Sequence, residues 1–167
     1  MINYWLFKVD SKSDLWTLWK KEHVISIDWN IGNIANSSIE EIKSKLVNNS
    51  SFSQTSDYIF NILHTFIGLL FGVEAMEDGD VVLLVDQEII LDFGILSIFE
   101  YKENGLTSNN DHTYCRKIRF LKKGPIKIAN LPKEFQQNGI YPIHLTDDIQ
   151  KYSITKEVFE NLLANIK

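Results

Sequence analysis

The chain has 167 residues, four tryptophans, one cysteine and a formal net charge of −5. The lone Cys115 excludes an internal disulfide and a cysteine-rich zinc site, and the acidic charge argues against a protein that holds nucleic acid by bulk electrostatics alone. A chain of this length fits one domain, residues 1–167, with a hydrophobic core of its own.

The first elements predicted along the chain are a strand, a helix and a second strand. Residues 3–9, NYWLFKV, are rich in aromatic side chains and predict a strand, and SKSDLWTLWKKE follows with a serine that can cap a helix. HVISIDW, residues 23–29, predicts the second strand. Its apolar and polar residues alternate from Ile25 to Trp29, which predicts a half-buried strand with Trp29 on the core side.

Two helices are predicted next. In SIEEIKSKLV, Ser38 is followed by Glu41 after three residues, which is the pattern of a capping box. A second, more apolar helix is predicted near residues 55–71 and is ended by Gly72. This apolar run contains Asn61 and His64 and is too short and too polar to span a bilayer.

The remaining pattern is mainly β. After an acidic turn around Gly79, VVLLVD, EIILDFGILSIFEY and HTYCRKIRFL predict three successive strands in a meander. One more extended segment is predicted at 140–145, and residues 154–166 predict a closing helix. The order predicts an α+β domain around a curved or barrel-like sheet. The N-terminus lacks the features of a secretory signal, so we expect a cytoplasmic protein.

No catalytic motif is found in the sequence. The four histidines show no pair at metal-ligand spacing, and no nucleophile elbow, phosphate loop or dinucleotide fingerprint is present. Asp111 and His112 are adjacent, but neighbours along a strand point to opposite faces, which argues against an acid–base pair. We therefore expect no catalytic residue, no metal and no cofactor.

A basic segment points to phosphate groups. RKIRFLKKGPIK, residues 116–127, carries six basic residues and no acidic one. Such a segment can contact phosphates, which position a duplex without reading its sequence, although a solvated strand-and-turn face would have the same composition. The candidate phosphate contacts are Arg116, Lys117, Arg119, Lys122 and Lys123.

Trp29 is a candidate for binding a base. It lies where a predicted strand ends and a loop of small polar residues begins. A base flipped out of a duplex is held by stacking on aromatic rings and by hydrogen bonds to its edge, which Asn30 or Ser26 could supply here. The alternative is that the indole simply buries area in the core, as most tryptophans do.

Several short motifs carry a resemblance to a known group. The opening NYWLFKVD resembles the YWLFKSEP opening of EVE domains, and MEDGDVVLLV, FGILSIFEY and HTYCRKIRFL resemble, in order, the second half of the PUA-like group that includes EVE and YTH domains. The segment ISIDWNIGN resembles a strand and glycine-containing loop in the N-terminal recognition domain of McrB-type, modification-dependent restriction systems. These matches run over most of the chain.

The resemblance implies a PUA-like (EVE/YTH-like) fold, with a curved β-barrel or pseudo-barrel sheet flanked by helices. It also implies a reader of double-stranded DNA that flips a modified base, above all a methylated one, into an aromatic pocket. Trp29 would be one wall and Asn30 would contact the base edge. The second wall of YTH readers comes from tryptophans in the loop before the closing strand, where this chain has none, so either Tyr101, His112 or Tyr114 would replace it or a different modification would be read. The pocket would also contain Asp28, Lys8, Val9 and Asp10.

The resemblance also implies partners. In those restriction systems an AAA+ GTPase motor follows the reader in the same chain and a separate nuclease subunit cuts, so we expect no enzymatic activity in these residues and no membrane association. The main alternative is an RNA-binding or RNA-cleaving protein of the related ASCH type. A third possibility is an assembly module that uses FIGLLFG as an interface.

Overall fold

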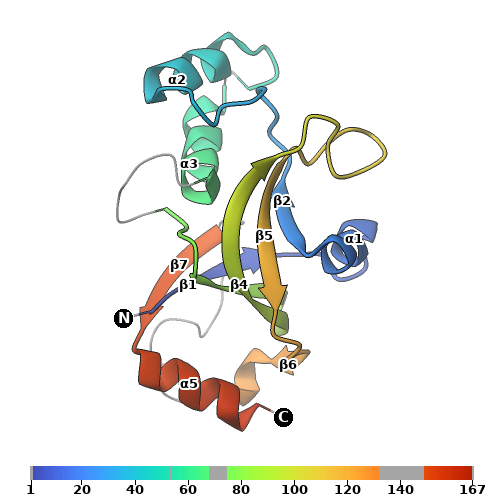
Figure 1. Cartoon of the computed structure of the whole chain (residues 1–167), viewed down its shortest axis with the longest axis vertical. Coiled ribbons are helices and arrows are strands. Elements are labelled where there is room, and N and C mark those ends of the chain that lie inside the picture. The colour runs from blue at the N-terminus through green and yellow to red at the C-terminus, as the bar shows by residue number, and fades with distance from the viewer. Residues whose placement is uncertain (1, 53, 68–74, 132–148, 167) are drawn as a thin grey trace. The chain divides into compact units, whose positions relative to one another are not determined.

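The computed structural model describes residues 2–52, 54–67, 75–131 and 149–166. The chain is α+β, with a mixed sheet and α-helices (Figure 1). Its described elements, in chain order, are β1 (Ile2–Lys8), α1 (Asp14–Glu22), β2 (Val24–Ile27), α2 (Ile39–Asn48), α3 (Ser56–Ile67), β3 (Val81–Asp86), β4 (Ile89–Tyr101), β5 (Tyr114–Phe120), β6 (Ile126–Lys127), the 3₁₀ helix η1 (Ile128–Asn130), β7 (Ile149–Ile154) and α5 (Lys156–Asn165).

The chain divides into two compact units, and β4 and β5 contribute residues to both. The first unit comprises Met1–His23, Asp78–Ser97 and Ile118–Lys167, and the second comprises Val24–Glu77 and Ile98–Lys117.

In the first unit, β1 lies between two partners of opposite direction. It pairs in parallel with β3, where Tyr4 lies opposite Val81, and antiparallel with β7, where Tyr4 lies opposite Tyr152. β3 pairs antiparallel with β4, and the short β6 adds to β4. The parallel pair β1–β3 makes the sheet mixed.

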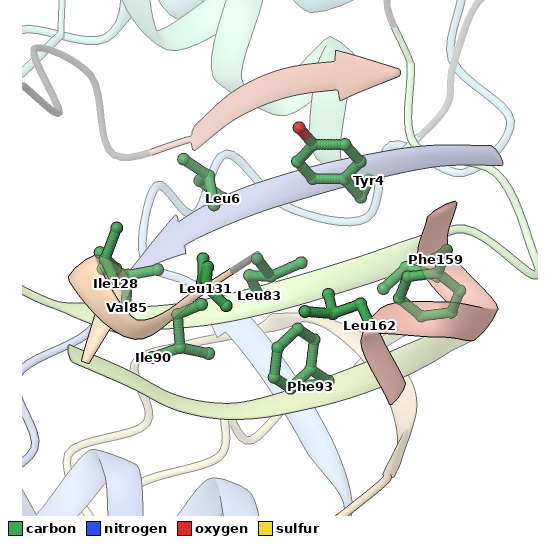
Figure 2. Packing of buried hydrophobic residues seen from close by; sticks show 11 residues of the cluster. Tyr4, Leu6, Leu83, Val85, Ile90, Phe93, Ile128, Leu131, Phe159 and Leu162 are labelled. Carbon is green, nitrogen blue, oxygen red and sulfur yellow. The ribbon is translucent and has the colours of Figure 1, made fainter. Parts of the chain in front are cut away.

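The core of the first unit is built from side chains of β1, β3 and β4, of the segment 128–131 and of one face of α5. Figure 2 shows side chains of β1, β3 and β4 together with Phe159 and Leu162 of α5. α5 is capped at its N-terminus by Thr155, whose hydroxyl accepts a hydrogen bond from the Val158 N–H at 3.3 Å. Burying one large apolar side chain stabilises a fold by roughly 1.5–3 kcal/mol, so this cluster contributes much of the unit's stability. The buried cluster comprises Tyr4, Leu6, Val81, Leu83, Val85, Ile90, Phe93, Ile128, Leu131, Phe159 and Leu162.

The second unit combines β2, parts of β4 and β5, and two helices. β2 pairs antiparallel with β5, from Val24 opposite Lys117 to Ile27 opposite Tyr114. α2 and α3 pack side by side (Figure 1). α2 begins at the predicted capping box, in which the Glu41 N–H donates to Ser38 Oγ at 3.2 Å and the Ser38 N–H donates to the Glu41 carboxylate at 2.7 Å.

Most predicted elements are confirmed, including the first strand and helix, the capping box and the β3–β4–β5 meander. The predicted half-buried strand at 23–29 is wrong in two respects. β2 ends at Ile27, and all four of its residues are buried because both of its faces are covered. In the described ranges, no helix is long and apolar enough to cross a membrane.

The end of the chain also differs from the prediction. The closing helix was predicted from residue 154, but Ile154 is the last residue of β7, a strand that the sequence reasoning missed, and α5 begins at Lys156. Gly72 and the extended segment predicted at 140–145 lie outside the described residues.

Candidate nucleic-acid site

The loop that follows β2 is held by a buried tyrosine. The Tyr114 hydroxyl donates to the Gly32 carbonyl at 2.6 Å and accepts from the Ile31 N–H at 3.1 Å. Tyr114 is fully buried, and burial raises its pKa to about 12, so the hydroxyl stays protonated and able to donate. Gly32 has a φ of +88°, a conformation that glycine adopts without strain. The loop therefore has a fixed path directly after Trp29.

Trp29 forms an aromatic pair with a residue of α3. Its ring centroid lies 6.2 Å from that of Tyr58, with an interplanar angle of 90°. Trp29 is half-buried and Tyr58 is 43% exposed, so the pair reaches the surface. Edge-to-face pairs of this kind stabilise by about 0.5–1.5 kcal/mol beyond the area that they bury. Sequence reasoning did not name Tyr58, because it lies on a separate helix and only the fold brings it to Trp29.

His112 and Asp28 connect the loop before β5 with the end of β2. The His112 N–H donates to Asp28 Oδ1 at 3.2 Å, and its ring Nδ1 lies 3.1 Å from Ser26 Oγ. His112 has a φ of +56°, which is uncommon for a residue with a side chain and is supported here by these two contacts. Of the predicted pocket residues, Asp28 and His112 are therefore brought together.

The tyrosines proposed as a second pocket wall pack on each other. The rings of Tyr101 and Tyr114 lie 5.6 Å apart at 43°. Tyr101 is half-buried, whereas Tyr114 is fully buried and its hydroxyl is engaged by the loop. Tyr114 thus supports the site from the interior, and its predicted role as an exposed wall is wrong.

Three predicted pocket residues belong to the first unit. Lys8 is exposed at the end of β1, and Val9 is 7% exposed and donates its N–H to the Val85 carbonyl at 2.9 Å. The Asp10 carboxylate accepts the Lys12 N–H at 2.9 Å. The predicted place of these residues in the base pocket stays a prediction.

Arg116 is not a phosphate contact. It is 3% exposed, and its Nη1 donates to the backbone carbonyls of Phe66 at 3.2 Å and Met76 at 3.0 Å. The prediction that Arg116 binds phosphate is therefore wrong. Its guanidinium is buried in the second unit and is engaged there by backbone carbonyls. The alternation along β5 was a usable signal, since Arg116 lies two residues before the buried Ile118 and so shares its face of the strand.

Of the four other predicted phosphate contacts, three are exposed and one is half-buried. Lys117, Arg119 and Lys122 are exposed. Lys123 is half-buried, and its ammonium donates to the Ile166 carbonyl at 3.4 Å.

Metal binding and thiol chemistry are two further possibilities for the described residues. Among them, no group of three or more His, Cys, Asp or Glu side chains is placed to hold a metal ion. Cys115 is fully buried, and burial raises its pKa to about 11, so its thiol is protonated near neutral pH. An aromatic pair beside a fixed polar loop can stack on a planar ring and bond to its edge.

Comparison with known proteins adds a structural likeness. No protein-family model matches the chain, and no significant match was found among curated proteins. The structure is similar to the X-ray crystal structure of protein Atu2648 from Agrobacterium tumefaciens, with 13% sequence identity over 97% of this chain and 91% of that chain, and a TM-score of 0.40.

Proposed function

We propose that this chain is a PUA-like domain that reads a modified base in double-stranded DNA and holds that base, flipped out of the duplex, against Trp29. The observation that carries the proposal is the surface pair of Trp29 and Tyr58, with ring centroids 6.2 Å apart, beside a loop held by the buried Tyr114. Stacking of one base on an aromatic side chain contributes about 1–3 kcal/mol, which is enough to offset much of the cost of unstacking it.

Tyr58 takes the role of the second aromatic group in this proposal. The resemblance to YTH readers calls for a second ring near the tryptophan, and Tyr58 is the ring that contacts Trp29 from α3. The 43% exposure of Tyr58 leaves much of the side chain open to a ligand. Tyr101 and His112 then support the pocket from β4 and from the loop before β5.

Discrimination by a methyl group alone is limited. Burying one methyl group is worth about 0.8 kcal/mol, or roughly fourfold in affinity. A larger preference requires that the unmodified base leave a polar group of the pocket without a partner. Exposed basic residues such as Lys117, Arg119 and Lys122 would contact phosphates and add affinity that does not depend on the modification.

The partners follow from the same proposal. A reader of this kind marks DNA for other components, namely an AAA+ GTPase motor in the same full-length chain and a separate nuclease subunit. The reader itself would then bind without cutting.

Binding of labelled duplexes tests the proposal. We would measure fluorescence anisotropy with duplexes that carry methylated adenine, methylated cytosine, hydroxymethylated cytosine or no modification. The wild type should prefer one modified duplex, Trp29→Ala should lose this preference, and Trp29→Phe should retain part of it. Ile98→Ala is the matched control, because Ile98 is an apolar residue of the same unit that is 55% exposed and lies on β4.

Two outcomes would overturn the proposal. Equal affinity of the wild type for all four duplexes would show that the domain does not recognise a modified base. Tighter binding or cleavage of labelled RNA would favour the alternative RNA-binding or RNA-cleaving function of the ASCH type.

A further inference from the structure

A shallow, open cleft lies beside the loop that carries Trp29. Its volume is about 510 Å³, and it lies between this loop and the C-terminal half of α2. None of its lining residues carries a carboxylate, and one of them, Lys45, carries a positive charge. The cleft is lined by Asn30, Ile31, Ser44, Lys45, Asn48 and Asn49.

Two of the three carboxamides that line the cleft, those of Asn30 and Asn49, are oriented by hydrogen bonds from the backbone. Asn30 Oδ1 accepts the Gly32 N–H at 2.8 Å, and Asn49 Oδ1 accepts the Ser51 N–H at 2.9 Å. A backbone N–H can pair only with the oxygen of an amide, so these bonds fix both orientations. The Nδ2 groups of Asn30 and Asn49 are therefore left to donate to a ligand, whereas Asn48 donates its own Nδ2 to Ser44 Oγ at 3.2 Å.

Lys45 sets the charge of the cleft. Its ammonium lies 3.5 Å from Ser37 Oγ, and the side chain is exposed. Asn49 is the C-cap of α2, where the helix dipole places a partial charge of about −0.5. The full positive charge of Lys45 exceeds this partial charge. Glu41, one turn earlier, is engaged by the Ser38 N–H at 2.7 Å in the capping box.

We propose that this cleft is a phosphodiester subsite for the DNA strand whose modified base lies against Trp29. An ammonium and two oriented N–H₂ groups match a ligand that only accepts hydrogen bonds, as phosphate oxygens do. Asn30 directly follows Trp29, and a flipped nucleotide keeps a phosphodiester on each side, so a phosphate must pass close to the base pocket. The inference rests on the proposed function. It adds a contact to the DNA backbone outside the basic segment 116–127, where the sequence predicted such contacts.

The salt dependence of binding tests this subsite. Neutralising one phosphate of duplex DNA changes the slope of log affinity against log salt by about 0.9. We would titrate salt with the preferred modified duplex and with its unmodified counterpart, using Lys45→Gln. The slope should fall in magnitude by about 0.9, and the affinities for both duplexes should fall by the same factor, because a phosphate contact carries no base information.

Lys43→Gln is the matched control. Lys43 lies on the same helix and carries the same charge, but its ammonium lies over the ring of Phe60 at 4.9 Å and it does not line the cleft. This control should keep the wild-type slope. Circular dichroism of both variants checks that α2 remains folded.

The outcomes separate this inference from the proposed function. An unchanged slope in Lys45→Gln, or an equal change in Lys43→Gln, would overturn the subsite even if Trp29 still reads the modification. If the wild type does not prefer modified DNA but Lys45→Gln still lowers the slope, the subsite stands and base reading fails. Failure to bind any duplex would overturn both.

Discussion

The hydroxyl of Tyr114, buried at the start of β5, donates to the carbonyl of Gly32 at 2.6 Å. This bond joins the interior of the second unit to the loop that begins with Trp29. The position of the indole therefore depends on a residue that a ligand cannot touch.

Tyr114→Phe should loosen this loop without opening a cavity. The variant loses the bonds to the Gly32 carbonyl and the Ile31 N–H, and we expect the free energy of unfolding to fall by about 1–2 kcal/mol. The proposed preference for the modified duplex should also fall in this variant, because the loop that carries Trp29 is held less firmly. Urea denaturation and anisotropy measure the two effects. Full preference in the folded variant would contradict a positioning role for Tyr114.

The raised pKa of Tyr114 predicts that the folded protein loses stability at alkaline pH. Burial raises the Tyr114 pKa from 10.0 to about 12, so the folded protein binds this proton more tightly than the unfolded chain does. The protonated hydroxyl contributes fully to the free energy of unfolding below about pH 10, and this contribution is lost as the pH rises toward about 12. The stability difference between wild type and Tyr114→Phe should therefore shrink across this interval. A constant difference, measured by urea denaturation at each pH, would refute the burial of the hydroxyl.

Cys115 should react slowly with thiol reagents in the folded protein. It is fully buried, and its pKa is raised by burial from 9.0 to about 11, so the reactive thiolate is scarce at pH 8. Reaction with a chromogenic disulfide should be slow in buffer and rapid and stoichiometric in denaturant. Rapid reaction without denaturant would show that β5 is more accessible than the structure indicates.

Arg116→Met should destabilise the second unit. It removes the donor to the Phe66 and Met76 carbonyls while keeping a long apolar side chain, and we expect a loss of about 2–3 kcal/mol in the free energy of unfolding. Lys117→Met is the control, because Lys117 is the exposed neighbour on the same strand and should change stability by less than about 0.5 kcal/mol. Equal, small losses in both variants would contradict the interior role of Arg116.

Local patterns predicted the local structure well. The capping box at Ser38 and Glu41 is a short-range device whose partners lie three residues apart, so the sequence alone sufficed to place the start of α2. β7 was missed because the polar residues of IQKYSI interrupt its apolar pattern, and its pairing with β1 joins opposite ends of the chain. No window of local sequence contains that pairing.

The candidate site was predictable in part. Trp29 was singled out by its place between a strand and a polar loop, but its partner Tyr58 lies on α3 and required the fold. Arg116 was misread because a run of basic residues was treated as one surface, whereas successive residues of a strand face opposite sides. Lys45 was overlooked because a single lysine on a polar helix carries no pattern of its own.

The proposed base flipping at Trp29 can be tested in solution with 2-aminopurine placed next to the modified base in the preferred duplex. Its fluorescence rises when its neighbour leaves the stack. We expect a rise on saturation with the wild type and none with Trp29→Ala at concentrations that saturate binding. Saturated binding of the wild type with no rise in fluorescence would contradict a flipped base against Trp29.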